Sequence, residues 1–332
     1  MAEAPLRLGT RGSALALAQA ELVAKALGDA EIVTIRTSGD EGTRRDPPAD
    51  GGAPGGDKAR FVREIERALI DGEVDLGVHS AKDLPTELPD GLELAGVPAR
   101  EDPRDAYVGN VSSLGDVPEG SRIGTSSLRR RAQILALRPD VEVVEVRGNV
   151  DTRLAKFEAG DYDGLVLAAA GLRRLSRAEE IAFPLELGDF VPAPGQGALA
   201  IEARHSDDRP AAAAASITDR GVLGAVSAER ALVAALEASC NTPLGANATL
   251  EQGGQMRIRA FCGLPDGSEW LRDEMAMDAS DPEALGRALA ERMKAAGAAE
   301  ILGRAERLAV AQPQTGRSSS IKRVAPKGSA LE

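Results

Sequence analysis

Residues 122–168, RIGTSSLRRRAQILALRPDVEVVEVRGNVDTRLAKFEAGDYDGLVLA, decide the fold class. Apolar runs and helical spacing of apolar side chains predict, in order, a strand at 122–123, a helix at 127–137, a strand at 141–146, a helix at 152–158 and a strand at 165–168. Strands that alternate with helices are typical of mostly parallel α/β sheets. In such sheets, ligands bind beyond the carboxyl ends of the strands.

The same alternation starts at the N-terminus. The predicted elements are a strand at 6–8, a helix at 14–27, a strand at 31–37, a helix at 60–70 and a strand at 74–78. Ser13 is placed to cap the first helix and Gly28 to end it. The first half of the chain is therefore expected to be α/β throughout.

The last third of the chain has a different pattern. It predicts a helix at 222–238, strands at 246–250, 256–262 and 269–272, and a helix at 282–295, which together make a separate α+β domain. Two segments lack such patterns. Residues 39–58 are rich in Gly, Pro and Asp and form either a mobile lid or a solvated loop, and the tail at 311–332 is expected to be disordered.

Composition excludes several classes of protein. The 332 residues carry a net charge of −12, which makes the chain a poor general nucleic-acid binder. Two cysteines cannot form a disulfide framework, and two histidines are too few for an obvious metal site. No signal peptide and no membrane span are evident, so we expect a cytoplasmic protein with reduced thiols and neither nucleic-acid nor membrane partners.

The helix predicted at 127–137 begins with three consecutive arginines, although a helix dipole disfavours cations in its first turn. Its expected buried stripe consists of Leu128, Ala132 and Leu135. We expect Arg129 and Arg130 to point away from that stripe and Arg131 to lie beside it. With the free N–H groups of the helix start, such arginines favour an anion site, and the alternative is a solvated basic helix end.

Further charged residues fall near strand ends. Arg11, Lys82, Arg147 and Arg153 each follow a predicted strand or begin a helix, where pockets of α/β proteins form. Asp83 is the one acid among these bases, and nearby cations would keep it ionised at neutral pH. The alternative for Asp83 is a structural ion pair.

Cys240 lies in the predicted turn ASCNTPLG, residues 238–245. A cysteine in a loop can be a nucleophile or an attachment point. Composition alone favours a partly buried free thiol. Cys262 lies inside a predicted strand and is expected in the core.

Seven stretches occur in a characteristic order. They are TRGS at 10–13, VHSAKD at 78–83, EDPRDA at 101–106, GTSSLRR at 124–130, RGNV at 147–150, PGQGA at 194–198 and the turn around Cys240. Together they resemble the porphobilinogen deaminase (hydroxymethylbilane synthase) family from about residue 6 to about residue 302.

This resemblance implies an α/β fold with two periplasmic-binding-protein-like lobes plus a C-terminal α+β domain. The implied boundaries are 1–98 with 198–216 for the first lobe, 103–192 for the second, 219–310 for the cofactor-carrying domain and 311–332 for the tail. The chain would cross between the lobes twice. A monomer is expected.

The resemblance also implies an activity. Cys240 would hold a dipyrromethane cofactor through a thioether. The enzyme would join four porphobilinogen molecules head to tail on that primer, lose ammonia each time and release hydroxymethylbilane by hydrolysis.

By motif match, Asp83 is the implied catalytic carboxylate. The implied cofactor-binding residues are Cys240, Lys82, Ser80, Thr125, Ser126, Arg129, Arg130, Arg147 and Gly148. The implied substrate-binding residues are Arg11, Ser13, Gln19, Arg147 and Arg153. Contacts of Lys58 and Arg131 with ligand are left open.

The residues suit this chemistry, because every pyrrole brings two carboxylates that a cluster of guanidinium groups could hold. The departing amine already carries its proton at neutral pH, so Asp83 is expected to stabilise the resulting azafulvenium cation rather than to donate a proton. Two alternatives stay open. One is a non-catalytic anion-binding protein on the same scaffold, and the other is the effector domain of a transcription regulator.

Overall fold

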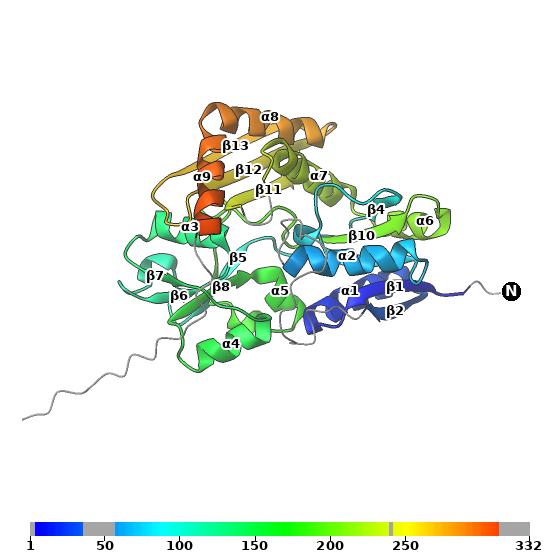
Figure 1. Ribbon diagram of the computed structural model, residues 1–332, viewed down its shortest axis with the longest axis horizontal. Coiled ribbons are helices and arrows are strands. Elements are labelled where there is room, and N and C mark those ends of the chain that lie inside the picture. The colour runs from blue at the N-terminus through cyan, green and yellow to red at the C-terminus, as the bar shows by residue number, and fades with distance from the viewer. Residues whose placement is uncertain (1–3, 36–56, 239–241, 312–332) are drawn as a thin grey trace, which may run out of the picture.

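The structure, a computed structural model, describes residues 4–35, 57–238 and 242–311. These residues form two lobes, each built on a five-stranded sheet, and a smaller domain on a three-stranded sheet that covers both (Figure 1). The α/β prediction with a C-terminal α+β domain is confirmed. None of the helices in the described ranges is long and apolar enough to cross a membrane.

The first lobe has the sheet order β2-β1-β3-β10-β4. Its strands are β1 (Leu6–Arg11), β2 (Ala30–Ile35), β3 (Leu76–Ser80), β4 (Leu92–Gly96) and β10 (Leu199–Arg204). Its helices are α1 (Ala14–Leu27), α2 (Asp57–Ile70), the 3₁₀ turn η1 (Ala81–Asp83) and α6 (Asp208–Ser216). β1, β2 and β3 are parallel, whereas β10 runs antiparallel to β3 and β4.

The second lobe repeats this plan with the order β7-β6-β8-β5-β9. Its strands are β5 (Asp105–Gly109), β6 (Arg122–Gly124), β7 (Glu142–Val144), β8 (Gly164–Ala168) and β9 (Phe183–Pro184). Its helices are α3 (Leu128–Leu137), α4 (Val150–Glu158), α5 (Ala169–Arg174) and the 3₁₀ turns η2 (Leu114–Asp116) and η3 (Ala178–Glu180). Again three strands are parallel, and the antiparallel strand β5 lies beside them.

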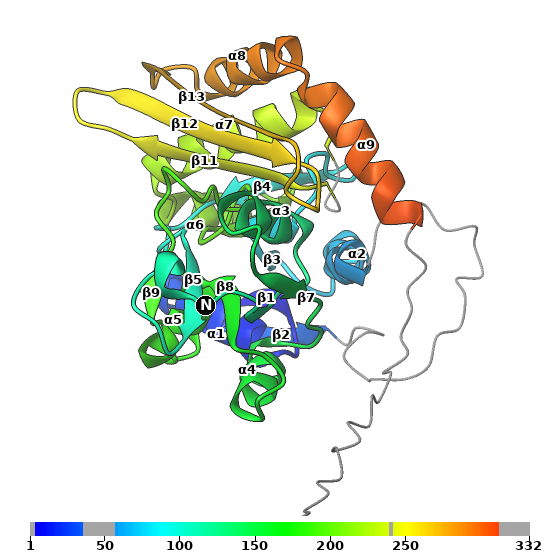
Figure 2. The ribbon, with the colours of Figure 1, turned by 90° about the vertical axis from the view of Figure 1, so that its left-hand side faces the viewer.

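The C-terminal domain is a meander of β11 (Leu244–Leu250), β12 (Gln255–Gly263) and β13 (Trp270–Asp278) with helices α7 (Arg220–Ala235), α8 (Pro282–Ala295) and α9 (Ala298–Ala311). α7 and α8 share one core with the sheet. Figure 2 shows this sheet lying across the lobes with α8 on its outer side. On the other face of this sheet, Phe261 of β12 packs against Ala132 of α3 and against Val191, so the sheet contacts the second lobe.

A buried carboxylate joins all three parts where the chain crosses between the lobes. Glu229 of α7 is fully buried and forms a two-pronged ion pair with Arg100, at 2.7 and 3.2 Å. Its carboxylate also accepts the backbone N–H groups of Gly195, at 2.6 Å, and Ala248, at 2.7 Å. The first crossing segment, which contains Arg100, the second crossing segment, which contains Gly195, and the C-terminal sheet are thus all bound to the Glu229 side chain.

The predicted helices at 14–27 and 282–295 occur with those bounds, and the strands of the α/β pattern occur within a few residues of the predicted ones. Helices α5, α6 and α9 and strands β4, β5, β9 and β10 were not predicted from the sequence. Most of the segment 39–58 and the tail from residue 312 lie outside the described residues. The individual domain boundaries stay predictions.

One prediction, the buried face of α3, is wrong. Arg129 and Arg130 are buried, with 4% and 6% of their surface exposed, whereas Leu128 and Leu135 are only partly buried. The physical reason is a buried carboxylate, Asp105, which allows both guanidinium groups to enter the interior.

A stability prediction follows from Glu66, which is buried on α2 against the first sheet. Burial and the nearby Glu202 raise its pKa to about 6 from 4.5, against the opposing effect of His79 and Arg63. Because the folded pKa lies above the unfolded pKa, the ionisation of Glu66 costs stability progressively between pH 4.5 and pH 6, and the full cost is present at higher pH. Glu66→Gln should therefore raise the free energy of unfolding by about 2 kcal/mol at pH 8 and by little below pH 4.5.

Urea denaturation at pH 8 and at pH 4.5 measures this effect. Glu73→Gln, which removes an exposed carboxylate from the turn that follows the same helix, is the control and should change neither value. A gain of equal size at both pH values would contradict the role given to the Glu66 charge.

Candidate active site

The first half of the candidate site lies at the carboxyl ends of two neighbouring parallel strands. β1 and β3 pair with Gly9 opposite Gly77, so Arg11 at the end of β1 and Ser80 at the end of β3 leave the sheet at the same edge. Lys82 and Asp83 follow in η1. This edge is where α/β sheets bind ligands.

Helix α1 supports the same edge. Ser13 caps its first turn by accepting the N–H of Ala16, at 3.4 Å. Gln19, one and a half turns further along, is buried and donates its amide N–H to the hydroxyl of Ser80, at 2.9 Å. The structure therefore brings five of the expected residues to one edge together with the predicted catalytic carboxylate, Asp83.

The second half lies at the matching edge of the other lobe. β6 and β7 pair with Gly124 opposite Val144, and the N–H of Thr125 donates to the carbonyl of Val144, at 2.9 Å. Ser126 and Arg147 follow these two strands. Gly148 has φ +119°, and a β-carbon there would lie 2.7 Å from the side chain of Thr152, so this position requires glycine.

Arg153 connects the two loops of this second half. Its guanidinium donates to the carbonyl of Gly148, at 2.8 Å, and to the hydroxyl of Ser126, at 3.2 Å. Burial, together with the neighbouring positive charge of Arg130, lowers the pKa of Arg153 to about 10. An anionic ligand placed here would relieve both effects.

Arg129 and Arg130 are anchored from behind by Asp105, which lies in the EDPRDA motif at 101–106 but was not predicted as a site residue. Asp105 accepts Nη1 of Arg129, at 2.7 Å, and Nε of Arg130, at 2.9 Å. Burial would raise the pKa of this carboxyl, but the two guanidinium groups hold it well below its usual range. Both arginines also donate to backbone carbonyls, those of Val191 and Val166.

The second crossing segment lies between the two halves. A β-carbon at Gly195, where φ is +72°, would lie 2.8 Å from the backbone nitrogen of Lys82. The next residue, Gln196, donates its amide to Asp105, at 2.9 Å. A chain of direct contacts therefore runs from the first-lobe edge through Gly195 and Gln196 to the arginines of α3.

Arg174 is a further cation that the sequence reasoning missed. It ends α5, a helix that contacts α1 of the other lobe, and it donates to the carbonyl of Gly197, at 2.7 Å. Burial lowers its pKa, with partial compensation by Glu101. Two features of the sequence could have indicated Arg174 as a site residue: the apolar run before it, and its position shortly after a strand. Arg131 instead donates to the carbonyl of Val143, at 2.9 Å.

Cys240 lies outside the described residues, as does the side chain of Lys58. The flanks of the Cys240 turn are described. Ala246, near the start of β11, donates its N–H to the carbonyl of Pro192, at 2.9 Å, and Thr242 is buried. The strand that follows the cysteine is thus fixed to the crossing segment between the two halves.

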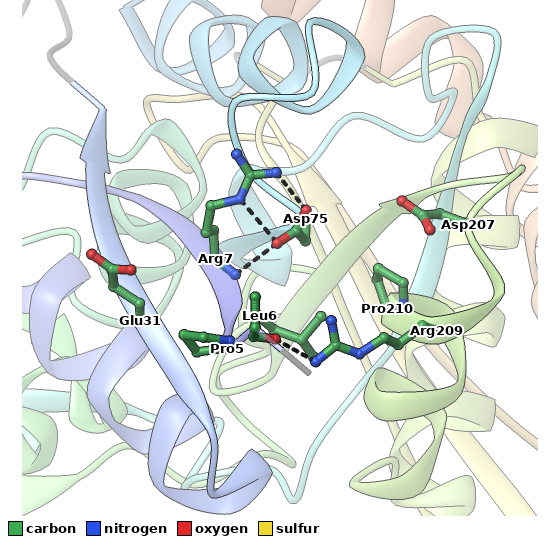
Figure 3. A pocket seen from close by; sticks show the side chains of 9 residues that line it. Pro5, Leu6, Arg7, Glu31, Asp75, Asp207, Arg209 and Pro210 are labelled. Carbon is green, nitrogen blue, oxygen red and sulfur yellow. Dashed lines mark hydrogen bonds and ion pairs between the residues drawn. The ribbon is translucent and has the colours of Figure 1, made fainter. Parts of the chain in front are cut away.

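A separate groove of about 410 Å³ lies elsewhere on the first lobe (Figure 3). It is lined by residues at the amino ends of β1, β2 and β3, such as Arg7, Glu31 and Asp75. Arg7 and Asp75 pair with each other at 2.7 Å, so their charges are already satisfied. This groove lies at the edge opposite the candidate site. No metal-binding group of His, Cys, Asp or Glu side chains occurs among the described residues.

The fold and the site define a two-lobed α/β protein that gathers cations and one carboxylate at the carboxyl ends of its strands. The family described as "Porphobilinogen deaminase, dipyromethane cofactor binding domain" matches residues 6–212, and "Porphobilinogen deaminase, C-terminal domain" matches residues 223–295. The chain belongs to the porphobilinogen deaminase family.

Curated relatives agree with this assignment. The chain is 46% identical over 302 residues to the porphobilinogen deaminase of Thermus thermophilus, which covers 89% of this chain and 97% of the relative. It is also 46% identical over 309 residues to that of Syntrophotalea carbinolica, covering 91% and 96%. A periplasmic solute-binding protein from Desulfovibrio salexigens is similar only at a TM-score of 0.39 and 13% identity, covering 65% of this chain and 73% of that one.

We predict that Asp105→Asn lowers the free energy of unfolding by about 3–5 kcal/mol, because it leaves two buried guanidinium groups without a counter-charge. Urea denaturation at pH 7 measures the loss. Glu145→Gln, which breaks the exposed pair with Arg147, is the control and should change stability by less than about 0.5 kcal/mol. An equal effect of the two substitutions would show that Asp105 does not anchor the arginines.

Proposed function

We propose that this chain is a hydroxymethylbilane synthase that joins four porphobilinogen molecules head to tail on a dipyrromethane primer, with release of ammonia and hydroxymethylbilane. The observation that carries the proposal is the placement of cations and one carboxylate at the carboxyl ends of strands in both lobes, which the segment containing Gly195 and Gln196 connects. Membership of the porphobilinogen deaminase family over most of the chain supports the same reaction.

The residues present fit a primer that carries several carboxylates. Arg153 has a lowered pKa caused by burial and a second cation, and its hydrogen bonds go to a carbonyl and a hydroxyl rather than to an acid. An acidic group would therefore find an uncompensated positive charge here. The residues proposed to hold the primer are Lys82, Ser80, Thr125, Ser126, Arg129, Arg130, Arg147 and Gly148.

Incoming porphobilinogen is proposed to bind through Arg11, Ser13, Gln19, Arg147 and Arg153. Arg129 and Arg130 already donate to Asp105 and backbone carbonyls. Their remaining N–H groups are the ones available to ligand, and Asp105 fixes the direction in which these groups point. Guanidinium forks of this kind orient carboxylates as well as attract them.

Asp83 is proposed to stabilise the positive charge that develops on the substrate pyrrole. An alkyl amine has a pKa of about 10, so the leaving group is already protonated at neutral pH and needs no acid. A carboxylate beside the reacting ring then lowers the barrier by charge stabilisation, and it can accept the proton that the ring loses afterwards. When bound, the primer supplies the carbon to which the substrate is joined.

The covalent attachment is proposed at Cys240 through a thioether. The following strand is fixed to Pro192, on the segment that separates the two half-sites, and this supports attachment at that turn. Cys262 is unsuited to the role, because it is fully buried in β12 and burial raises its pKa to about 12. A monomeric state, a cytoplasmic location and the absence of nucleic-acid and membrane partners stay predictions.

Intact mass spectrometry tests the attachment. The purified protein should exceed its sequence mass by two linked pyrrole units, and Cys240→Ser should have the sequence mass. Cys262→Ala should keep the excess mass, because that thiol lies in the core. An adduct that survives Cys240→Ser would contradict the proposed linkage, and absence of any adduct on the wild type favours a non-catalytic anion-binding protein.

Steady-state turnover tests Asp83. Asp83→Asn keeps the shape of the side chain and removes its charge, so kcat for porphobilinogen should fall by about 100-fold or more while the primer mass is retained. The exposed Asp90→Asn is the matched control and should turn over like the wild type. Near-normal turnover of Asp83→Asn would remove the carboxylate from the mechanism.

A further inference from the structure

The two arginines of the second lobe that are proposed to bind substrate lie in different electrostatic surroundings. Arg153 donates to the carbonyl of Gly148 and to the hydroxyl of Ser126, and it forms no ion pair within the described part of the chain. Arg147 instead donates its Nε to Oε1 of Glu145, at 2.8 Å. One of these cations therefore has a counter-charge within the protein, and the other has none among the described residues.

Glu145 lies where a ligand can displace it. Val146, between Glu145 and Arg147, is fully buried, whereas the side chains on either side of it keep 60% and 57% of their surface exposed. Asp105, the counter-charge of the α3 arginines, is fully buried and stays enclosed with them. The Glu145 carboxylate can instead rotate into water, because exposed side chains change rotamer within nanoseconds.

The pair with Glu145 leaves most N–H donors of Arg147 open. Glu145 accepts a hydrogen bond from Nε alone, and neither Nη1 nor Nη2 of Arg147 donates to a described residue. These two nitrogens form a fork that can bind a carboxylate through two parallel hydrogen bonds. A ligand carboxylate can therefore contact Arg147 before Glu145 has left it.

The backbone around Arg147 is fixed by contacts that do not involve Glu145. Nζ of Lys156 donates to the carbonyl of Arg147, at 3.1 Å, and Arg153 donates to the carbonyl of Gly148, at 2.8 Å. Removal of the Glu145 charge should therefore change the electrostatic surroundings of the Arg147 guanidinium and leave the loop in place.

We propose that Glu145 is a displaceable counter-ion of Arg147, which weakens the binding of a substrate carboxylate by this guanidinium and rebinds the guanidinium when that carboxylate leaves. This inference rests on the proposed function of the site. Four porphobilinogen molecules have to bind there in turn, so at least one cation has to exchange its carboxylate readily. Arg147 is suited to that exchange, whereas Arg153, which has no acidic partner among the described residues, is suited to lasting binding.

The test compares kcat and KM for porphobilinogen at low salt in the wild type, Glu145→Gln and the control Glu142→Gln. Glu142 is exposed on β7 and forms no ion pair with a described residue, so its substitution changes the net charge equally. Because exposed ion pairs are weak, Glu145→Gln should lower KM by about two- to fivefold. Slower exchange of the carboxylate should lower kcat by a similar factor.

Salt gives a second readout of the same pair. In about 1 M salt, which screens exposed charges, both differences between Glu145→Gln and the wild type should shrink. Glu142→Gln should follow the wild type at both salt concentrations. An unchanged or higher KM for Glu145→Gln at low salt, an unchanged kcat, or the same effect in Glu142→Gln overturns the proposal.

If the wild type consumes no porphobilinogen, the proposed function fails instead, and binding then judges the pair. Calorimetric titration with porphobilinogen should give a dissociation constant about two- to fivefold lower for Glu145→Gln than for the wild type and Glu142→Gln. Equal dissociation constants, or no binding by any of the three proteins, overturn the proposal.

Discussion

Two buried carboxylates, Asp105 and Glu229, hold the chain where it passes between the lobes, and the geometry of the site depends on them. Asp105 forms ion pairs with the buried Arg129 and Arg130, and it accepts a hydrogen bond from the amide of Gln196 in the second crossing segment. Glu229 fixes Arg100 of the first crossing and Gly195 of the second. Buried pairs of this kind add little stability over apolar packing, but loss of one partner leaves an uncompensated charge. These ion pairs therefore determine the positions in which the lobes pack, and contribute little to the free energy of unfolding compared with apolar packing.

The site solves an electrostatic problem. A chain of net charge −12 is proposed to collect a product with many carboxylates, so local cations must oppose the field of the whole protein. The two lobes supply these cations from equivalent places, the carboxyl ends of β1 and β3 and those of β6 and β7. The cations are positioned by partners behind them: Asp105 behind α3, and the backbone of Gly148 beneath Arg153. Ser80 is positioned in the same way, because its hydroxyl accepts a hydrogen bond from the buried amide of Gln19 on α1.

Elements whose signal is local in the sequence could be predicted. The bounds of α1 follow from its cap at Ser13 and its stop at Gly28, and the motif residues were assigned to strand ends that the structure places at two edges. Prediction failed where the partner is distant. The burial of Arg129 could not be seen from helical periodicity, because its counter-charge lies on another strand. β10 was missed because its neighbours in the sheet, β3 and β4, precede it by more than 100 residues, and α9 was missed although Ile301, Leu302 and Ala305 have helical spacing.

The placement of β10 has a consequence for biosynthesis. This strand lies inside the first sheet, between β3 and β4, yet it is translated only after the entire second lobe. Strands β1 to β4 therefore leave the ribosome before the strand that joins β3 to β4 exists. The edges of β3 and β4 stay unpaired while about 100 further residues are synthesised. During that interval the nascent first lobe presents unpaired backbone to its surroundings. The second lobe, whose strands are contiguous in the chain, is the part that can complete its sheet first.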